Sequence, residues 1–291
     1  MKSITTLFIC IAFCLSAEAG NIRKDSLAFI NADWETTELG HGAKALHASI
    51  QMFDSQQSIS VIKYPARRFR TRLLHSPGDQ ADKTSAIAER EGAYAAVNGG
   101  YFDMAQLLPC VYFRTGDEVY GQTSPSEAFR VNGVVGTRDK RGRKVMISSC
   151  SPSEYEEITG NWHSVMASGP MLVDEGEILV PQYTETDENG KGIDAFNDYR
   201  HPRSVIGYDD KGNVYLVVID GRHPGKGDGT SIYETALICR FLGMEDALNL
   251  DGGGSSALWH KETGVLSHPS DNKTFDHEGE RAIPNIIGVY R

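Results

Sequence analysis

Two aspartates stand directly after apolar runs of the sequence, and glycine follows each of them. Asp220 comes after Val214–Ile219 and precedes Gly221 and Arg222. The second aspartate follows Ala247–Leu250 and opens the run Asp251, Gly252, Gly253, Gly254, Ser255 and Ser256. Glycine lets a backbone turn sharply, and successive N–H groups of such a turn can bind an anionic oxygen. Arginine binds phosphate or carboxylate through two parallel hydrogen bonds. The pattern predicts an anion-binding site at the ends of two strands.

Three more polar residues adjoin apolar runs. Asn98 follows Tyr94–Val97 and precedes two glycines, Ser168 precedes a Gly-Pro pair, and Arg203 precedes a predicted strand. The Asn98 amide is both donor and acceptor, so it suits a sugar hydroxyl or a phosphate oxygen. Tyr101, close behind it, could stack on a sugar ring, although core packing is the commoner role of an aromatic residue.

Several functional classes are disfavoured. The net charge of −10 argues against binding to nucleic acid or to an acidic lipid surface. No lysine precedes Ser255, so the glycine run differs from a P-loop, and no G-x-S-x-G elbow of a triad hydrolase is present. The histidines and cysteines lack the spacing of zinc ligands.

Most of the elements that must position these residues are strands. Two helices are predicted, over 82–91 and 231–242; the second opens with a capping box of Ser231 and Glu234. Alternating or β-rich runs predict strands at 46–53, 58–64, 94–97, 129–135, 144–147, 214–219, 247–250 and 286–290. The predicted fold class is therefore α+β (mixed α/β): a single domain on a mixed, largely antiparallel β-sheet core, with a few helices and glycine-rich loops at strand ends.

Two polar stretches, 181–203 and 267–281, are long for loops of a compact domain. Such loops are often lids or binding loops, and surface decoration is the alternative. Cys110 and Cys150 could form a disulfide in an oxidising compartment, while Cys239 lies in the second predicted helix. Three small buried hydrophobic side chains are the alternative reading of these cysteines.

The first residues are typical of an export signal. A lysine at position 2, an apolar run over 7–15 and an A-x-A pattern ending at Ala19 predict cleavage near that residue. The expected organisation is a signal peptide over 1–19, an N-terminal extension contributing strands over 20–92, and the main part of the single domain over 93–291. The expected location is periplasmic, at the cell surface or secreted, without membrane insertion. Nothing in the sequence defines an oligomeric state.

Taken in order, the motifs resemble those of the phosphodiester glycosidase family. The resemblance covers about residues 93–291. It rests on the motifs Val97–Phe102, Ser168–Leu172, Arg203–Ser204, Asp220–Arg222, Leu250–Ser256 and Arg281–Asn285.

The resemblance implies hydrolysis of a sugar-1-phosphodiester at the bond between the anomeric carbon and oxygen, releasing a free, N-acetylglucosamine-like sugar and a phosphomonoester. Asp251 and Asp220 are the catalytic candidates, as nucleophile or as acid/base. The expected substrate is a small molecule or a glycan phosphodiester, for example of a cell envelope or exopolysaccharide. The residues expected to bind it are Asn98, Ser168, Arg203, Arg222, Gly252, Gly253, Gly254, Ser255 and Ser256.

No cofactor is expected, but two alternatives stay open. One is a metal-dependent phosphodiesterase, in which Asp220, Asp251, Asn98 and Asp103 would supply oxygen ligands to Ca²⁺ or Mg²⁺. The other is a module that binds phosphorylated glycans without turnover.

Overall fold

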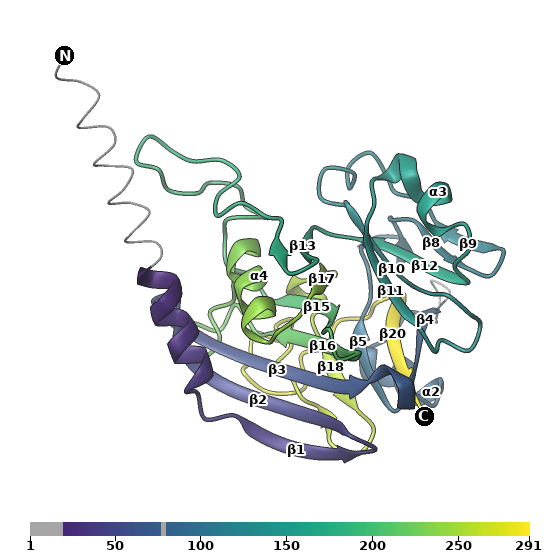
Figure 1. Ribbon diagram of the computed structural model, residues 1–291, viewed down its shortest axis with the longest axis horizontal. Helices are drawn as coiled ribbons and strands as arrows, with labels where there is room; N and C mark the ends of the chain where they lie inside the picture. The colour runs from purple at the N-terminus through teal and green to yellow at the C-terminus, as the bar shows by residue number, and fades with distance from the viewer. Residues whose placement is uncertain (1–19, 77–79) are drawn as a thin grey trace.

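The computed structural model describes residues 20–76 and 80–291, and its largest element is an eight-stranded sheet (Figure 1). In spatial order its strands are β1 (Glu35–Gly40), β2 (Ala43–Met52), β3 (Ser55–Pro65), β16 (Asn213–Ile219), β15 (Arg203–Tyr208), β17 (Asp246–Asn249), β13 (Met171–Asp174) and β14 (Glu177–Ile178). Strands from the first 65 residues thus lie beside strands from the last third of the chain.

Two five-stranded sheets and a short two-stranded sheet complete the β-structure. The first five-stranded sheet is ordered β11 (Val145–Ser149), β10 (Gly133–Thr137), β12 (Ser164–Ser168), β8 (Phe113–Thr115) and β9 (Glu118–Gly121). The second is ordered β19 (Gly264–Val265), β18 (Leu258–His260), β5 (Ala95–Asn98), β20 (Asn285–Tyr290) and β4 (Arg70–His75). Strands β6 (Phe102–Asp103) and β7 (Leu108–Pro109) form the small sheet. Adjacent strands are antiparallel, which confirms the predicted fold class.

Helices are few and short. One runs over residues 20–30, and the others are α2 (Thr84–Arg90), α3 (Tyr155–Thr159) and α4 (Ile232–Phe241), with 3₁₀ turns η1 (Ala66–Arg68), η3 (Pro152–Glu154) and η4 (Gly253–Ser255). Both predicted helices are confirmed within two residues at each end. The predicted capping box is present: the Ser231 hydroxyl accepts a hydrogen bond from the Glu234 amide at 3.1 Å.

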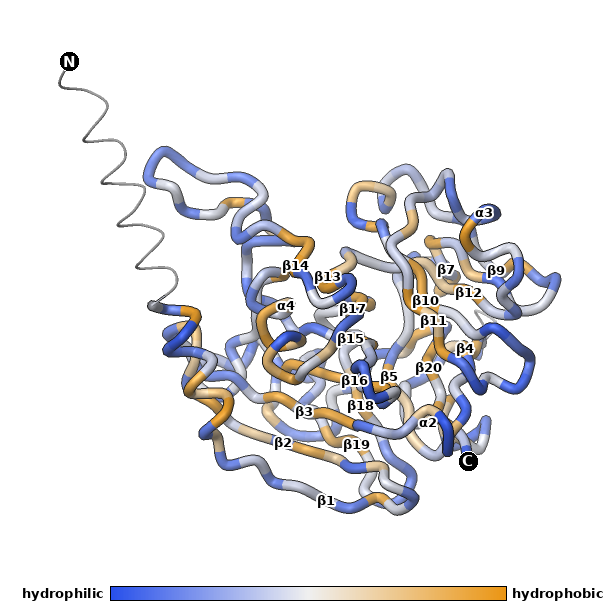
Figure 2. The backbone as a smooth tube through the Cα atoms, in the orientation of Figure 1, coloured by the Kyte–Doolittle hydropathy of each residue, from blue (hydrophilic) through white to orange (hydrophobic). Residues whose placement is uncertain are grey.

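The core lies in layers on the two faces of the large sheet. On one face, Ile62, Leu216 and Leu248 pack against Val97 and Ile287 of the second five-stranded sheet. On the other face, the strands pack against α4 and the helix over 20–30. Figure 2 shows the strands as apolar segments inside a hydrophilic border of loops. The central strands of the large sheet are thereby covered on both faces, which fixes where their ends project.

Two sequence predictions are wrong. The predicted strand 129–135 begins only at Gly133, because residues 126–130 form a turn in which Phe129 is 69% exposed. Cys110 and Cys150 are free thiols in one apolar cluster, where burial raises the pKa of Cys110 to about 12 and that of Cys150 to about 11. Cys239 is likewise a free, buried thiol. The predicted signal segment, 1–19, lies outside the described residues.

Candidate active site

Asp251 lies where two strand ends from different sheets meet. Strand β17 carries the chain into the glycine turn, and the Asp251 amide donates to the Gly99 carbonyl at 3.1 Å. In return the Asn98 side chain donates to the Asp251 carbonyl at 2.7 Å. The Asn98 oxygen also accepts hydrogen bonds from Ser204, at 2.7 Å, and from the Ala257 amide, at 3.2 Å. The Asn98 amide is therefore committed to holding the turn in place.

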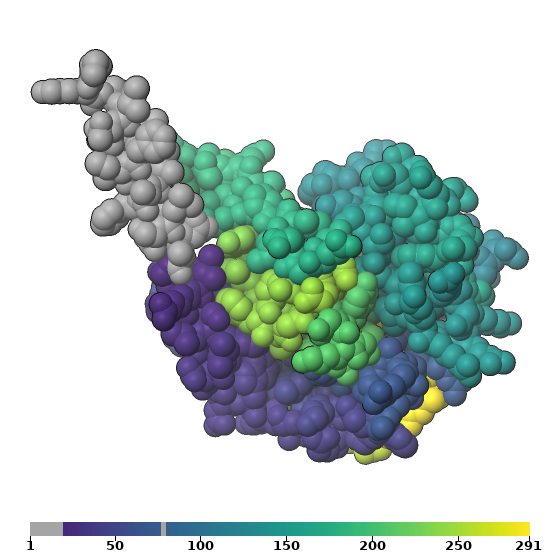
Figure 3. Space-filling model, in the orientation of Figure 1, coloured from purple at the N-terminus to yellow at the C-terminus, as the bar shows by residue number. Residues whose placement is uncertain are grey.

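The Asp251 carboxyl group opens into a cleft of about 320 Å³. Its walls come from the turn after β17, from Tyr101 and Arg130, and from the long segment between β14 and β15, including Phe196. Figure 3 shows a notch in the surface between that segment, in green, and the part of the chain that holds β8 to β12, in teal. Both long polar stretches contribute to the cleft, the second through Arg281.

Four arginines line this cleft, and Asp251 is the one carboxylate among its described lining residues. Arg281 pairs with Asp271 through Nε at 2.8 Å and Nη2 at 2.7 Å. Arg130 pairs with Glu127 and lies over the Tyr101 ring, 3.9 Å from its centroid. Two of the four cations are thus neutralised by carboxylates of their own.

The other two arginines, Arg203 and Arg222, form no ion pair within the described part of the chain. Arg203 is 2% exposed and donates to the carbonyls of Thr230, Phe196 and Tyr199 at 2.7–3.1 Å. Burial lowers its pKa to about 10. Because a buried charge without a counter-ion is costly, this cation favours an anion in the cleft.

Arg222 reaches the cleft from the glycine-rich loop after β16. Its φ of +66° is unusual for a residue with a side chain, and its guanidinium lies against Gly253. A Cβ at Gly253 would stand 2.9 Å from Nη2 of Arg222. Glycine there lets the guanidinium approach the backbone of the turn, so this cation lies directly beside the turn that carries Asp251.

The electrostatics of Asp251 combine two opposing influences. Burial raises the pKa of its carboxyl to about 6, while the Ser255 side chain, the charges of Arg130 and Arg281, and the Gly252 amide, at 3.0 Å, act to lower it. A carboxyl group with a pKa near 6 is mostly ionised at neutral pH and is still basic enough to accept a proton.

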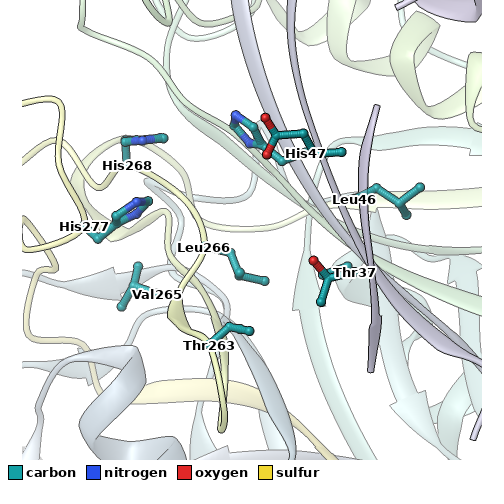
Figure 4. Close-up of a pocket in the computed structure, with 10 residues that line it drawn as sticks. Thr37, Leu46, His47, Thr263, Val265, Leu266, His268 and His277 are labelled. Atoms are coloured by element: carbon teal, nitrogen blue, oxygen red, sulfur yellow. The ribbon is translucent and has the colours of Figure 1, made fainter. Parts of the chain in front are cut away.

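Asp220 does not line this cleft, although it follows a strand of the same sheet. Its carboxylate is 1% exposed and accepts hydrogen bonds from the Ser58 hydroxyl, at 2.6 Å, and from the amide and Nδ1 of His268, at 2.7 and 2.8 Å. His268 lines a separate pocket together with His47 and His277 (Figure 4). The structure therefore does not bring the two predicted catalytic carboxylates together.

The predicted serines lie behind the cleft surface. The Ser168 hydroxyl donates to the Asn249 carbonyl at 2.8 Å and so ties β12 to the end of β17. The Ser255 hydroxyl lies close enough to the Asp251 carboxyl to favour its ionised form. The Ser256 hydroxyl is buried without a hydrogen-bond partner among the described residues. Ser168 thus supports the turn, while Ser255 acts on the carboxyl group that the turn carries.

The oxygen-ligand set of the metal alternative does not converge. The Asp103 carboxylate is exposed and accepts from the amides of Ala105 and Gln106, while Asp220 and Asn98 are occupied as described above. Across 20–76 and 80–291, no three His, Cys, Asp or Glu side chains are placed to hold a metal ion.

Sequence reasoning missed Arg130 and Phe196. Arg130 was hidden inside a predicted strand, and its acidic partner Glu127 three residues earlier was the available signal. Phe196 lies in a stretch without periodicity, where only its isolation among polar residues marks it.

Comparison with known proteins agrees with the fold and with the motifs. Residues 91–290 match the profile of the phosphodiester glycosidase family, and the chain belongs to that family. It is similar to N-acetylglucosamine-1-phosphodiester alpha-N-acetylglucosaminidase from Bos taurus, 28% identical over 218 residues, and from Mus musculus, 24% identical over 275 residues. These matches cover 72% and 89% of this chain but only 39% and 50% of the relatives.

Among solved structures, the chain is similar to the catalytic domain of the zebrafish enzyme of the same name, which was solved auto-inhibited by its pro-peptide. The TM-score is 0.64 at 18% identity. The match covers 89% of this chain and 88% of that one. The chain thus has the fold of that catalytic domain.

Proposed function

We propose that this protein hydrolyses a sugar-1-phosphodiester. Water adds its oxygen to the anomeric carbon, the bond from that carbon to the phosphate oxygen breaks, and the products are a free, N-acetylglucosamine-like sugar and a phosphomonoester. The proposal draws on family membership and on the names of the curated relatives, whose length this chain spans only in part.

The observation that carries the proposal is the pair of arginines without carboxylate partners, Arg203 and Arg222, beside a glycine turn. Phosphate fits such a place because guanidinium groups carry positive charge and donate hydrogen bonds to its oxygens. A phosphate monoester also leaves readily from carbon, so neutralising its charge matters more than protonating it.

We assign Asp251 as the general base that activates the attacking water. As the one carboxylate among the described residues of the cleft wall, it would take the proton from the incoming water while the arginines hold the departing phosphate. Asp220, bound to Ser58 and His268, would support the loop that carries Arg222.

Isotope labelling tests the reaction. The protein would be incubated with an N-acetylglucosamine-1-phosphodiester in ¹⁸O-water, and mass spectrometry would locate the label. Label on the sugar is expected. Label on the phosphate would overturn the proposal in favour of a phosphodiesterase, and binding without turnover would favour a glycan-binding module. The variant D251N serves as the inactive control.

Export belongs to the same proposal. No helix among the described residues is long and apolar enough to cross a membrane. We propose that residues 1–19 act as a signal peptide and that the mature chain works outside the cytoplasm, where glycans joined through phosphodiesters occur. Residues 20–92 would then form an extension to the catalytic domain over 93–291. Mass spectrometry of the secreted chain should find its first residue near Gly20; a retained Met1 would contradict this part.

A further inference from the structure

Six cationic side chains outside the cleft gather where the loop between β10 and β11 packs on β4. We name this group the basic recess; its members are Arg70, Arg72, Arg138, Lys140, Arg141 and Arg143. All six are exposed, and four of them line a hollow of about 430 Å³. None of the described residues lining that hollow is acidic.

The fold forces these charges together. The Thr71 amide donates to the Gly142 carbonyl at 2.8 Å, which pins the loop to β4. Gly142 has a φ of +67°, and a Cβ on it would collide with the Thr71 carbonyl. Arg70 and Arg72 flank Thr71 in the strand, and since alternate residues of a strand face opposite sides, both point away from the core.

The charges of the basic recess are left without counter-ions. None of its members takes part in the ten ion pairs of the described chain. The carboxylate of Asp139, within the loop, accepts from the Arg141 amide at 2.7 Å. In a chain of net charge −10, such a concentration of exposed positive charges creates a local field that attracts anions.

Strand β10 connects the recess with the cleft. Its first residue, Gly133, is close to Arg130 and to the Ser168 end of β12, whereas its last, Thr137, lines the hollow. Four residue steps separate the strand's ends, about 13 Å at the usual rise of a strand.

We propose that the basic recess binds a further anionic stretch of a polymeric glycan phosphodiester whose reactive linkage occupies the cleft. This inference rests on the proposed function. A recessed site suits a flexible chain better than a flat membrane. The acidic remainder of the molecule also disfavours an extended anionic surface or a nucleic-acid duplex.

The test measures binding of fluorescently labelled poly(glycerol phosphate) between 50 and 200 mM salt. The variant R138Q/K140Q/R141Q/R143Q should bind at least tenfold more weakly at the low salt concentration. The slope of log affinity against log salt should fall by about 3, since each phosphate contact contributes roughly 0.7 on a single-stranded polyanion. Its kcat/KM on a small sugar-1-phosphodiester should stay within twofold of the wild type.

A matched control, K191Q/K211Q/K261Q/K273Q, removes four exposed lysines outside the recess and should keep the polymer affinity within threefold. Equal weakening in both variants would overturn the proposal, as would a wild type that does not bind the polymer. Binding to phosphatidylglycerol vesicles but not to the polymer would assign the recess to membranes instead. If polymer binding depends on the basic recess but no small phosphodiester is hydrolysed, the proposed function is wrong, while the role of the basic recess in binding an anionic polymer is confirmed.

Discussion

The carboxyl group of Asp251 shares its cleft with four arginines, yet its pKa is raised to about 6 because burial outweighs the Ser255 side chain and the charges of Arg130 and Arg281. Within the folded protein the ionised form is therefore disfavoured relative to an aspartate in water. This places the acid–base change of the residue close to neutral pH, where a general base works best.

We expect kcat/KM for a sugar-1-phosphodiester to rise with pH through about 6 and then to level off, because Asp251 must be ionised to accept a proton. The variant D251N should lose at least a thousandfold in kcat and the limb near pH 6. A steady-state pH profile from 4.5 to 8.5 measures both. An unchanged profile in the variant would remove Asp251 from the chemistry.

The ionisation of Asp251, which we expect to raise kcat/KM, should at the same time lower the stability of the folded protein. A folded pKa above the unfolded value of 3.8 stabilises the protein below pH 4, and this contribution is lost as pH rises through about 6. At pH 8, D251N should therefore raise the free energy of unfolding by about 2 kcal/mol, less than the full shift implies because the side chain is partly accessible. Urea unfolding of the wild type and of D251N at pH 4 and pH 8 tests this. The same change in the free energy of unfolding at both pH values would contradict it.

Arg222 provides a test of the phosphate contact. The substitution Arg222→Lys keeps the charge but loses the planar pair of donors, so kcat/KM should fall about ten- to a hundredfold with the fold intact. The matched control is Lys226→Gln in the same loop, an exposed residue that does not line the cleft. Equal kinetics of R222K and wild type would take Arg222 out of the site.

At the residue scale, the sequence predicted Asp251, Arg203 and Arg222 at strand ends, and the structure places all three in the lining of one cleft. Each could be singled out because it lies next to, or within three residues of, an apolar run that predicted a strand. Asp220 met the same criterion, but strand position does not define which way a side chain turns, and this one turns to Ser58 and His268. Ser58 and His268, which bind the Asp220 carboxylate and so set its direction, are 162 and 48 residues away in sequence.

At the element scale, the turn after β17 depends on Gly254. A Cβ there would overlap the Asp271–Arg281 pair, which packs directly on the turn. Because this glycine is not among those with positive φ, alanine suits its backbone and the clash falls on the pair alone.

The variant G254A should displace Arg281 and lower kcat/KM at least tenfold. In a D271A/R281A background the same substitution should cost little further, since nothing remains to collide with. This coupling is measured from kcat/KM of G254A, of D271A/R281A and of the variant that combines the three substitutions. Additive losses would mean that Gly254 acts through something other than the pair.

The length of each strand explains how well the sequence predicted it. Strands β3 and β16 carry long β-rich runs; the prediction missed one residue of β16, and three residues at the start and one at the end of β3. Strands β8, β9 and β14 have two to four residues, and no period can be read from so few. The turn at 126–130 ends in Phe129 and Arg130, shortly before β10, so these two residues were predicted as the start of a strand. Local hydrogen bonds from the amides of Glu127, Ala128 and Arg130 close the turn, and Phe129 and Arg130 contact Phe196.

For the whole molecule, the placement of its carboxylates predicts the response to chelators. The proposed oxygen ligands lie apart, so dialysis against EDTA should leave hydrolysis within a factor of two, and added Ca²⁺ or Mg²⁺ should not raise it. Loss of activity that returns with either ion would revive the metal-dependent phosphodiesterase.

Net charge describes the molecule as a whole and not its parts. The total of −10 argues against nucleic acid or an acidic lipid surface as a partner. A total does not show where charges cluster, and the fold brings Arg70 and Arg72 beside a loop almost seventy residues later in sequence.

Strand β10 has one more consequence. It is hydrogen-bonded on both sides, to β11 and β12, so the cleft and the basic recess stand at a fixed separation. An enzyme with two anchor points on a rigid spacer acts as a molecular ruler. Chains long enough to reach both points would be degraded quickly, shorter ones slowly, and oligomers just below that length would accumulate as limit products.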